Sequence, residues 1–370
     1  MATSINRPPT ISITSLLLSI LLLAARGSCE SVPGFYIFGD SLVDVGNNNH
    51  LIVTLARANM RHNGVDFPTG KATGRFSNGK NAADFLAEKV GLPSPPPYMS
   101  LVPKSKQSRD LNAPVTGVNF ASGGAGILNG TDELFRESYP LTRQVGYFSL
   151  VHDQLVQQLG SDKAQAHLSK SLFLVVIGSN DLFDYFNKMS KVSKQYTPEQ
   201  YVDLMLSTLK GLSKRLYELG ARKFTVNGVG LIGCCPIFRK KSTSSDCDAE
   251  ANLLAMKYND GLKTLLEELK NESSDIRYSY FDTYNAVDNI IQHPETYGIT
   301  EIREACCGRG TLKAEALCTP LSTYCSNRKN YLFWDLFHPT EYTSSIIADL
   351  IYNGSQQVTT PMNLEQLINL

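Results

Sequence analysis

An alternation of short apolar runs with longer amphipathic segments is the feature that most constrains this fold. Runs typical of buried strands occupy residues 34–38, 117–120, 172–177, 223–227 and 277–281. Apolar residues at spacings of three and four, typical of helices, occur in residues 81–90, 201–219, 249–269 and 341–352. Strands that alternate with helices predict an α/β fold, in which a parallel sheet is covered by helices on both faces.

Polar loops follow several of the predicted strands, and another precedes the last predicted helix. In a parallel α/β sheet such loops meet at the carboxyl ends of the strands, where ligands bind. We therefore expect one polar site, formed by the loops at Asp40-Ser41, Ser122-Gly123, Ser179-Asn180-Asp181 and Asp335-His338.

The residue types in these loops are those of an acyl-transfer enzyme. A serine hydroxyl is a weak nucleophile, so it needs an imidazole to take its proton and an acid to orient that imidazole. Ser41 is the candidate nucleophile, His338 the base and Asp335, three residues earlier, its orienting acid. Each residue alone is also explained by a turn or a helix cap, and the adjacent pair His152-Asp153 illustrates how common such proximity is. The catalytic interpretation depends on the set.

The same loops offer donors for a developing oxyanion. The Ser41 and Gly123 N–H groups and the Asn180 side-chain amide are the candidates, because backbone N–H groups at a helix start and carboxamides stabilise negative charge. A tight turn at Gly123 and a helix cap at Asn180 are the alternatives. We expect Asp181 to cap the following helix.

The first residues predict export. Arg7 precedes an apolar stretch from Ile11 to Ala25 and then the small residues Gly27 and Ser28, which is typical of a cleaved signal peptide. The stretch is shorter than the roughly 20 residues of a membrane-spanning helix. We therefore expect a signal peptide over residues 1–29, a mature single domain over residues 30–370, no stable membrane span and an extracellular protein.

The cysteines agree with an oxidising compartment. Of eight cysteines, Cys29 lies near the predicted cleavage site, and seven lie in the second half of the chain without a Cys-x-x-Cys pair, so disulfides are favoured over a zinc site. We expect local disulfides between Cys235 and Cys247 and between two among Cys306, Cys307, Cys318 and Cys325. The odd number leaves at least one thiol, unless it pairs between chains.

Glycosylation and charge bear on the expected partners. Sequons occur at Asn129, Asn271 and Asn353, as in an exported glycoprotein, although such triplets also arise by chance. Lys plus Arg and Asp plus Glu each number 35, so no net field attracts nucleic acid or an anionic membrane. A small-molecule or lipid ester is the expected partner. The oligomeric state stays open.

Several blocks, in chain order, resemble those of plant GDSL esterases/lipases of the SGNH hydrolase group. They are residues 38–48 (FGDSLVDVGNN), 73–80 (TGRFSNGK), 119–127 (NFASGGAGI), 176–181 (VIGSND), 233–236 (GCCP) and 333–340 (FWDLFHPT). The resemblance covers nearly the whole mature chain, and no matched position departs from the pattern.

This resemblance implies a flavodoxin-like three-layer α/β/α sandwich and a secreted carboxylic ester hydrolase that acts through an acyl-enzyme. It places the catalytic triad on Ser41, Asp335 and His338 and the oxyanion hole on Ser41, Gly123 and Asn180. It implies neither a cofactor nor a metal. An extracellular acyltransferase and a polysaccharide deacetylase would use the same site, so the sequence leaves the natural ester open.

Other classes explain the sequence less well. An ordinary α/β-hydrolase needs Gly-x-Ser-x-Gly, which is absent from the chain. A P-loop over Gly74 to Lys80 fails because Asn81 replaces the required Ser or Thr and no strand precedes it. A non-catalytic binding protein on the same fold is possible in principle, but the intact set of Ser41, Asp335 and His338 argues against it.

Overall fold

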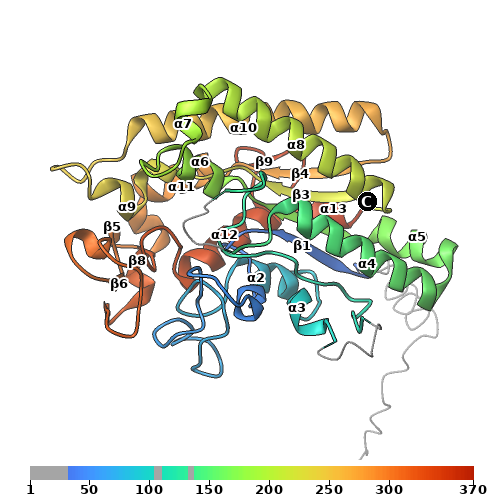
Figure 1. The fold of residues 1–370 in the computed structure, drawn as a ribbon, viewed down its shortest axis with the longest axis horizontal. Helices are drawn as coiled ribbons and strands as arrows, with labels where there is room; N and C mark the ends of the chain where they lie inside the picture. Colours follow the sequence, from blue (N-terminus) through green and yellow to red (C-terminus); the bar gives the residue numbers. More distant parts are fainter. Residues whose placement is uncertain (1–31, 104–110, 132–136) are drawn as a thin grey trace, which may run out of the picture.

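A five-stranded sheet forms the centre of the protein (Figure 1). The computed structural model describes residues 32–103, 111–131 and 137–370. The strand order is β1-β2-β3-β4-β9, in which β1 to β4 are parallel and β9 is antiparallel to β4. The strands are β1 (Phe35–Gly39), β2 (Leu172–Val176), β3 (Lys223–Asn227), β4 (Arg277–Phe281) and β9 (Thr359–Thr360).

Four of the five predicted strands are confirmed as β1 to β4. The fifth, residues 117–120, lies along the free edge of β1 but makes only isolated bridges, in which Asn119 pairs with Ile37 and with Pro97. The segment still hydrogen bonds to β1, because the Ile37 N–H donates to Val118 O at 3.0 Å and the Phe120 N–H donates to Ile37 O at 2.7 Å. It therefore delivers its following loop to the same end of the sheet.

Helices cover both faces of the sheet, as the sequence predicts (Figure 1). The four predicted helices correspond to α2, α8, α10 and α12. The helices are α2 (Ala82–Lys89), α3 (Tyr98–Leu101), α4 (Leu141–Leu159), α5 (Ser161–Lys170), α6 (Ser179–Tyr185), α7 (Val192–Gln195), α8 (Pro198–Glu218), α9 (Pro236–Arg239), α10 (Ala249–Glu272), α11 (Thr283–Gln292), α12 (Glu341–Asn353) and α13 (Leu364–Ile368).

The alternation of side chains along β1 divides the core into two layers. Tyr36 and Phe38 pack into a cluster with α4, α5, α8 and α10, whereas Phe35 and Ile37 pack into a second cluster with α2, α12 and α13. This arrangement follows from the strand period of two, which sends successive side chains to opposite faces. The fold is therefore the expected α/β sandwich with a mostly parallel sheet.

A smaller unit lies between α11 and α12 and carries the last polar loop. Strand β5 (Glu301–Ala305) pairs in parallel with β8 (Tyr331–Phe333), and β6 (Cys307–Gly308) pairs antiparallel to β7 (Thr323–Tyr324). Two disulfides, Cys306–Cys325 and Cys307–Cys318, brace this unit. All four of these cysteines are paired, one pair more than the sequence predicted.

The predicted Cys235–Cys247 disulfide is wrong, because Cys247 pairs with Cys234. Asp248 N–H donates to Gly233 O at 2.9 Å, which brings Cys247 beside Cys234 at the start of α10. The Cys235 side chain points elsewhere and packs among Ile290 and the end of β8 as a buried free thiol. Which of two adjacent cysteines faces a partner is decided by tertiary packing.

The predicted signal peptide, residues 1–29, lies outside the described residues. Within the ranges that are described, no helix is long and apolar enough to cross a membrane.

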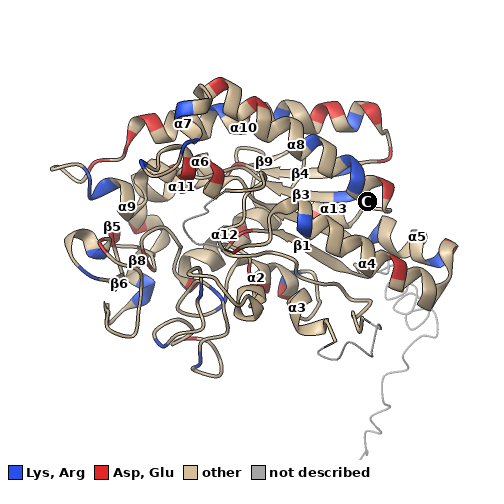
Figure 2. Cartoon of the chain, in the orientation of Figure 1, with Lys and Arg blue, Asp and Glu red and all other residues tan. Residues whose placement is uncertain are grey.

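Lys and Arg are interspersed with Asp and Glu along α8 and α10 (Figure 2). Ion pairs join these two helices, among them Lys210–Glu268 at 2.6 Å and Lys214–Glu272 at 2.7 Å.

Candidate active site

Ser41 lies two residues beyond β1, at the carboxyl end of the sheet. Buried Gln144 of α4 clamps the last strand residue, because its amide both accepts from Gly39 N–H and donates to Gly39 O, each at 2.8 Å. Position 39 requires glycine, since a Cβ there would lie 2.3 Å from Val176 O. The chain then turns as Leu42 N–H donates to Asp40 Oδ1 at 2.9 Å. These contacts fix the backbone that presents Ser41.

The loop after β8 presents Asp335 and His338 as one rigid piece. Trp334 N–H donates to His338 O at 2.7 Å and closes the loop. Inside it, the Asp335 carboxylate accepts from the backbone N–H of His338 at 2.9 Å and of Phe337 at 3.2 Å. The Trp334 indole N–H donates to Asn63 Oδ1 at 2.9 Å, which ties the loop to the segment before α2.

The structure brings the three predicted catalytic residues into hydrogen-bond contact. His338 Nε2 lies 2.7 Å from Ser41 Oγ, and His338 Nδ1 lies 2.8 Å from Asp335 Oδ2. Because a carboxylate only accepts, Nδ1–H donates to Asp335 and Nε2 is left to accept from the serine hydroxyl. All three are buried. This is the geometry that a base-activated serine requires.

Two aromatic rings hold the His338 imidazole in place. Phe76 lies with its ring centroid 5.0 Å from that of His338, and Phe337 meets the imidazole edge-on at 4.6 Å. A Cβ on Gly123 would lie 2.4 Å from the Phe76 ring, so glycine at position 123 leaves space for it. Phe76 was not among the predicted site residues, although it lies within the block at residues 73–80.

The three predicted oxyanion donors differ in their hydrogen bonds. The Ser41 N–H makes none to another described residue. Asn180 donates one amide hydrogen to Ala125 O at 2.9 Å, which leaves its second hydrogen available. The Gly123 N–H points at Asp44 Oδ2, at 3.0 Å. Gly124, the next residue, lines the hollow in front of Ser41 together with Asn180.

Asp44 connects the loop that carries Ser41 to the loop that carries Gly123. Its buried carboxyl accepts from Gly46 N–H at 2.7 Å, Asn47 N–H at 2.8 Å and Gly123 N–H. Burial raises the pKa of Asp44 to about 6, and these backbone donors act in the opposite direction. Asp44 was not among the predicted site residues, although it lies in the same block as Ser41.

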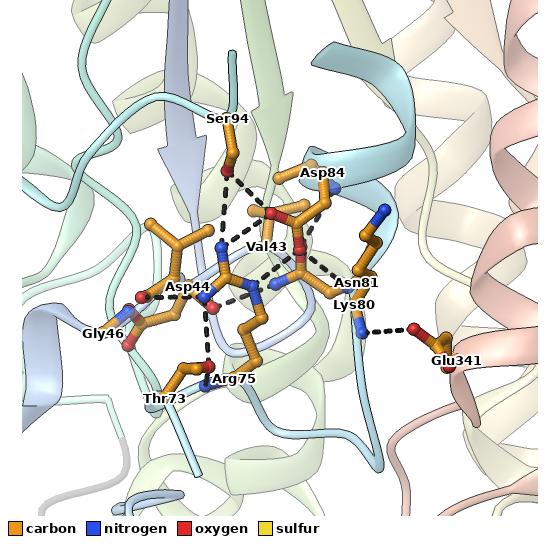
Figure 3. A network of polar contacts seen from close by, with 12 residues as sticks. Val43, Asp44, Gly46, Thr73, Arg75, Lys80, Asn81, Asp84, Ser94 and Glu341 are labelled. Atoms are coloured by element: carbon orange, nitrogen blue, oxygen red, sulfur yellow. Dashed lines mark hydrogen bonds and ion pairs between the residues drawn. The ribbon is translucent and has the colours of Figure 1, made fainter. Parts of the chain in front are cut away.

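A buried ion pair fastens these loops to α2 (Figure 3). Arg75 donates to both Asp84 oxygens at 2.6 Å, and Ser94 Oγ donates to Asp84 Oδ1 at 2.7 Å. Asn81 donates to Asp44 O at 2.9 Å and also caps α2. The network therefore positions the loop after Ser41 and the segment that carries Phe76.

Asp40, directly before Ser41, is buried with one carboxylate oxygen unpartnered among the described residues. Burial raises its pKa to about 7, opposed by the hydrogen bond from Leu42 N–H and by the nearby His338.

The predicted cap at Asp181 is wrong. Gly178 is the N-cap of α6, and Asp181 instead accepts from Ile127 N–H at 2.9 Å and Thr131 Oγ1 at 2.7 Å.

The other predicted positions carry no contact that assigns a role. Asn129, Asn271 and Asn353 are all exposed, and their glycosylation stays a prediction. Among the residues that the structure describes, no group of three or more His, Cys, Asp or Glu side chains could hold a metal ion.

Comparison with known proteins decides the family. A profile of GDSL-like lipases/acylhydrolases matches residues 35–351. The chain belongs to the GDSL lipase/acylhydrolase family. The predictions of this family and of a carboxylic ester hydrolase are thereby confirmed.

Several GDSL esterases/lipases of Arabidopsis thaliana are similar to the chain over nearly its full length. One is 48% identical over 98% of this chain and 99% of its own. Another is 41% identical over 94% of both chains. A solved catalytic mutant of an acetylxylan esterase from Geobacillus stearothermophilus covers 86% of this chain and 93% of its own at 15% identity, with a TM-score of only 0.38.

Proposed function

We propose that this GDSL family member is a secreted serine esterase that hydrolyses lipid-type acyl esters through an acyl-enzyme. The observation that carries the proposal is the hydrogen-bonded series Ser41 Oγ, His338 Nε2, His338 Nδ1 and Asp335 Oδ2, with contacts of 2.7 and 2.8 Å. Acyl transfer by a serine nucleophile needs these three side chains in that order.

In the proposed reaction His338 takes the Ser41 hydroxyl proton as Oγ attacks the ester carbonyl. Asp335 holds the imidazole in the required tautomer and stabilises its positive charge. In this proposal the Ser41 N–H and the second Asn180 amide hydrogen stabilise the oxyanion. His338 then gives the proton to the departing alcohol, and water, activated by the same imidazole, releases the acid.

The disulfides support the secreted location. The described residues contain three, Cys234–Cys247, Cys306–Cys325 and Cys307–Cys318. Such bonds persist in oxidising compartments and are rare in the cytosol. Export therefore agrees with the signal peptide that the sequence predicts.

The test combines labelling with kinetics. A fluorophosphonate probe should label the folded protein at Ser41, and Ser41→Ala should abolish labelling. Ser41→Ala and His338→Ala should each lower ester turnover by roughly three or more powers of ten, and the double variant should be little worse, because the residues act as a unit. His152, which is half-buried on α4 and paired with Asp153, gives the matched control His152→Ala. Normal turnover by either triad variant would exclude the mechanism.

A further inference from the structure

Two hollows of different chemistry meet at Ser41. The first hollow has the polar side chains Arg57, Asn63 and Asp335 in its walls beside apolar ones such as Leu55 and Met60. The apolar pocket is lined chiefly by Phe183, Leu231, Ile232, Val287, Leu332 and Ile347. Ser41, Asn180, Phe337 and His338 line both. The two hollows therefore offer separate spaces for the two substituents of an ester carbonyl attacked by Ser41.

The apolar pocket is suited to a hydrocarbon chain. No Lys, Arg or Glu occurs among the described residues that line it, and its acidic group is Asp40, whose pKa burial raises. The Cys235 thiol in its wall is a small apolar group, since burial raises its pKa to about 12 and keeps it protonated. The pocket has a volume of about 110 Å³, several times the roughly 10–15 Å³ that one water needs.

The reaction itself assigns the two substituents. The alcohol must leave from a side that polar groups and water can reach, because His338 protonates it and then activates a water there. The acyl chain stays attached to Ser41 through both steps and gains from apolar contact throughout. The first hollow, with the charged groups Arg57 and Asp335 in its walls, suits the alcohol, and the apolar pocket suits the acyl chain.

We propose that the apolar pocket is the acyl-chain site and that it gives the enzyme a preference for unbranched acyl groups of several carbons over acetyl. The inference rests on the proposed esterase function. Val287, half-buried on α11, is the residue at which the preference is set, because it faces Gly230 across the pocket. A Cβ built on Gly230 would meet Val287 Cγ2 at 3.8 Å and Thr283 Cγ2 at 3.4 Å.

The experiment measures kcat/KM for p-nitrophenyl acetate, butyrate, hexanoate and octanoate. Each buried methylene is worth about fourfold, so the unmodified protein should prefer hexanoate to acetate by at least tenfold. Val287→Trp fills the pocket and should lower the hexanoate-to-acetate ratio at least tenfold. Val287→Ala enlarges it and should raise the octanoate-to-hexanoate ratio. Val115→Trp, the same change at an exposed valine outside both hollows, should leave the ratios within twofold.

Each outcome decides the proposal. Unchanged kcat/KM ratios between acyl lengths in both Val287→Trp and Val287→Ala would overturn it. The proposal would also fail if Val287→Trp changed only the dependence of kcat/KM on the length of the alcohol, measured with a series of acetyl esters, because the pocket would then hold the alcohol. If Val287→Trp does not fold, Gly230→Val fills the same space from the opposite wall. Acetate hydrolysis that disappears in Ser41→Ala but shows no acyl preference would refute the acyl site alone. Acetate hydrolysis that survives Ser41→Ala would refute the proposed function.

Discussion

At the scale of single residues, the site combines a fixed imidazole with a side-chain amide, that of Asn180, of which only one hydrogen is used in a hydrogen bond. His338 is fixed by Asp335 on one side and by the Phe76 and Phe337 rings on others. Asn180 is anchored through Ala125 O but keeps one amide hydrogen. A side chain that is held in place but still has a donor hydrogen without an acceptor can stabilise a developing charge without having to move.

Asn180→Ala should therefore slow the chemistry more than it weakens binding. Loss of one oxyanion donor lowers kcat by roughly 10²–10³ with a smaller change in KM. Steady-state kinetics with a short-chain ester, together with a thermal melt, checks this. If the melting temperature falls sharply while kcat of the folded fraction is unchanged, Asn180 serves only to hold Ala125.

Asp40 should make stability depend on pH. Its pKa is about 7 in the folded protein, against an ordinary value near 4. Between these values the folded state binds a proton that the unfolded chain releases, so this contribution to stability falls as pH rises from about 4 to about 7. Asp40→Asn removes the titration. The melting temperature of Asp40→Asn minus that of the unmodified protein should therefore increase from pH 5 to pH 8.

The matched control for this pH effect is Asp203→Asn, at an exposed position on α8. The difference between its melting temperature and that of the unmodified protein should stay constant across the same pH range. An Asp40→Asn difference that is equally constant would mean that the Asp40 carboxyl does not titrate in this range.

At the scale of elements, loops rather than strands bring the site together, and buried polar groups hold the loops. The Arg75–Asp84 pair connects the segment with Phe76 to α2 (Figure 3). Burial by itself would raise the pKa of Asp84, but the Arg75 guanidinium holds it below its usual value. Removal of one partner leaves the other charged and buried.

Arg75→Met should therefore lower the free energy of unfolding by about 3–5 kcal/mol, and Arg75→Met with Asp84→Leu should lower it less. Urea denaturation of both variants and of Asp84→Leu completes the double-mutant cycle. The exposed pair Arg215–Glu218 on α8 is the control, for which we expect less than about 1 kcal/mol. A double variant as unstable as the sum of the single ones would show that the two residues act independently.

At the scale of the whole molecule, disulfides stabilise the unit that carries Asp335 and His338. The bonds Cys306–Cys325 and Cys307–Cys318 close loops with sequence separations of 19 and 11. A bond that closes a loop of this length contributes about 3 kcal/mol. Reduction should therefore lower the melting temperature and the temperature at which activity is lost on heating.

Non-reducing peptide mapping tests the connectivity directly. We expect Cys234–Cys247 together with the two bonds above, and a Cys235 thiol that alkylates only after unfolding, because it is buried. A peptide that joins Cys235 to Cys247 would contradict this packing. Calorimetry with and without reductant measures the stabilisation.

The sequence alone determined the α/β fold and the positions of the polar loops. Both depend on local periodicity, because a strand has a period of two and a helix of 3.6, and because strands alternating with helices form a parallel sheet. The triad candidates followed from the chemistry of Ser41, His338 and Asp335 at the loop positions. Helices α4 and α5 were missed, although Val145, Phe148 and Val151 repeat at a spacing of three.

Only the tertiary structure decided which of several equivalent side chains faces which partner. It paired Cys247 with Cys234 rather than Cys235, and it directed Asp181 into a loop instead of a helix cap. It also brought Phe76 onto His338 and the Gly123 N–H onto Asp44, and it opened the apolar pocket beside Ser41. These contacts join residues far apart in the chain, so they follow from the packing of whole elements and leave no period or spacing in the sequence.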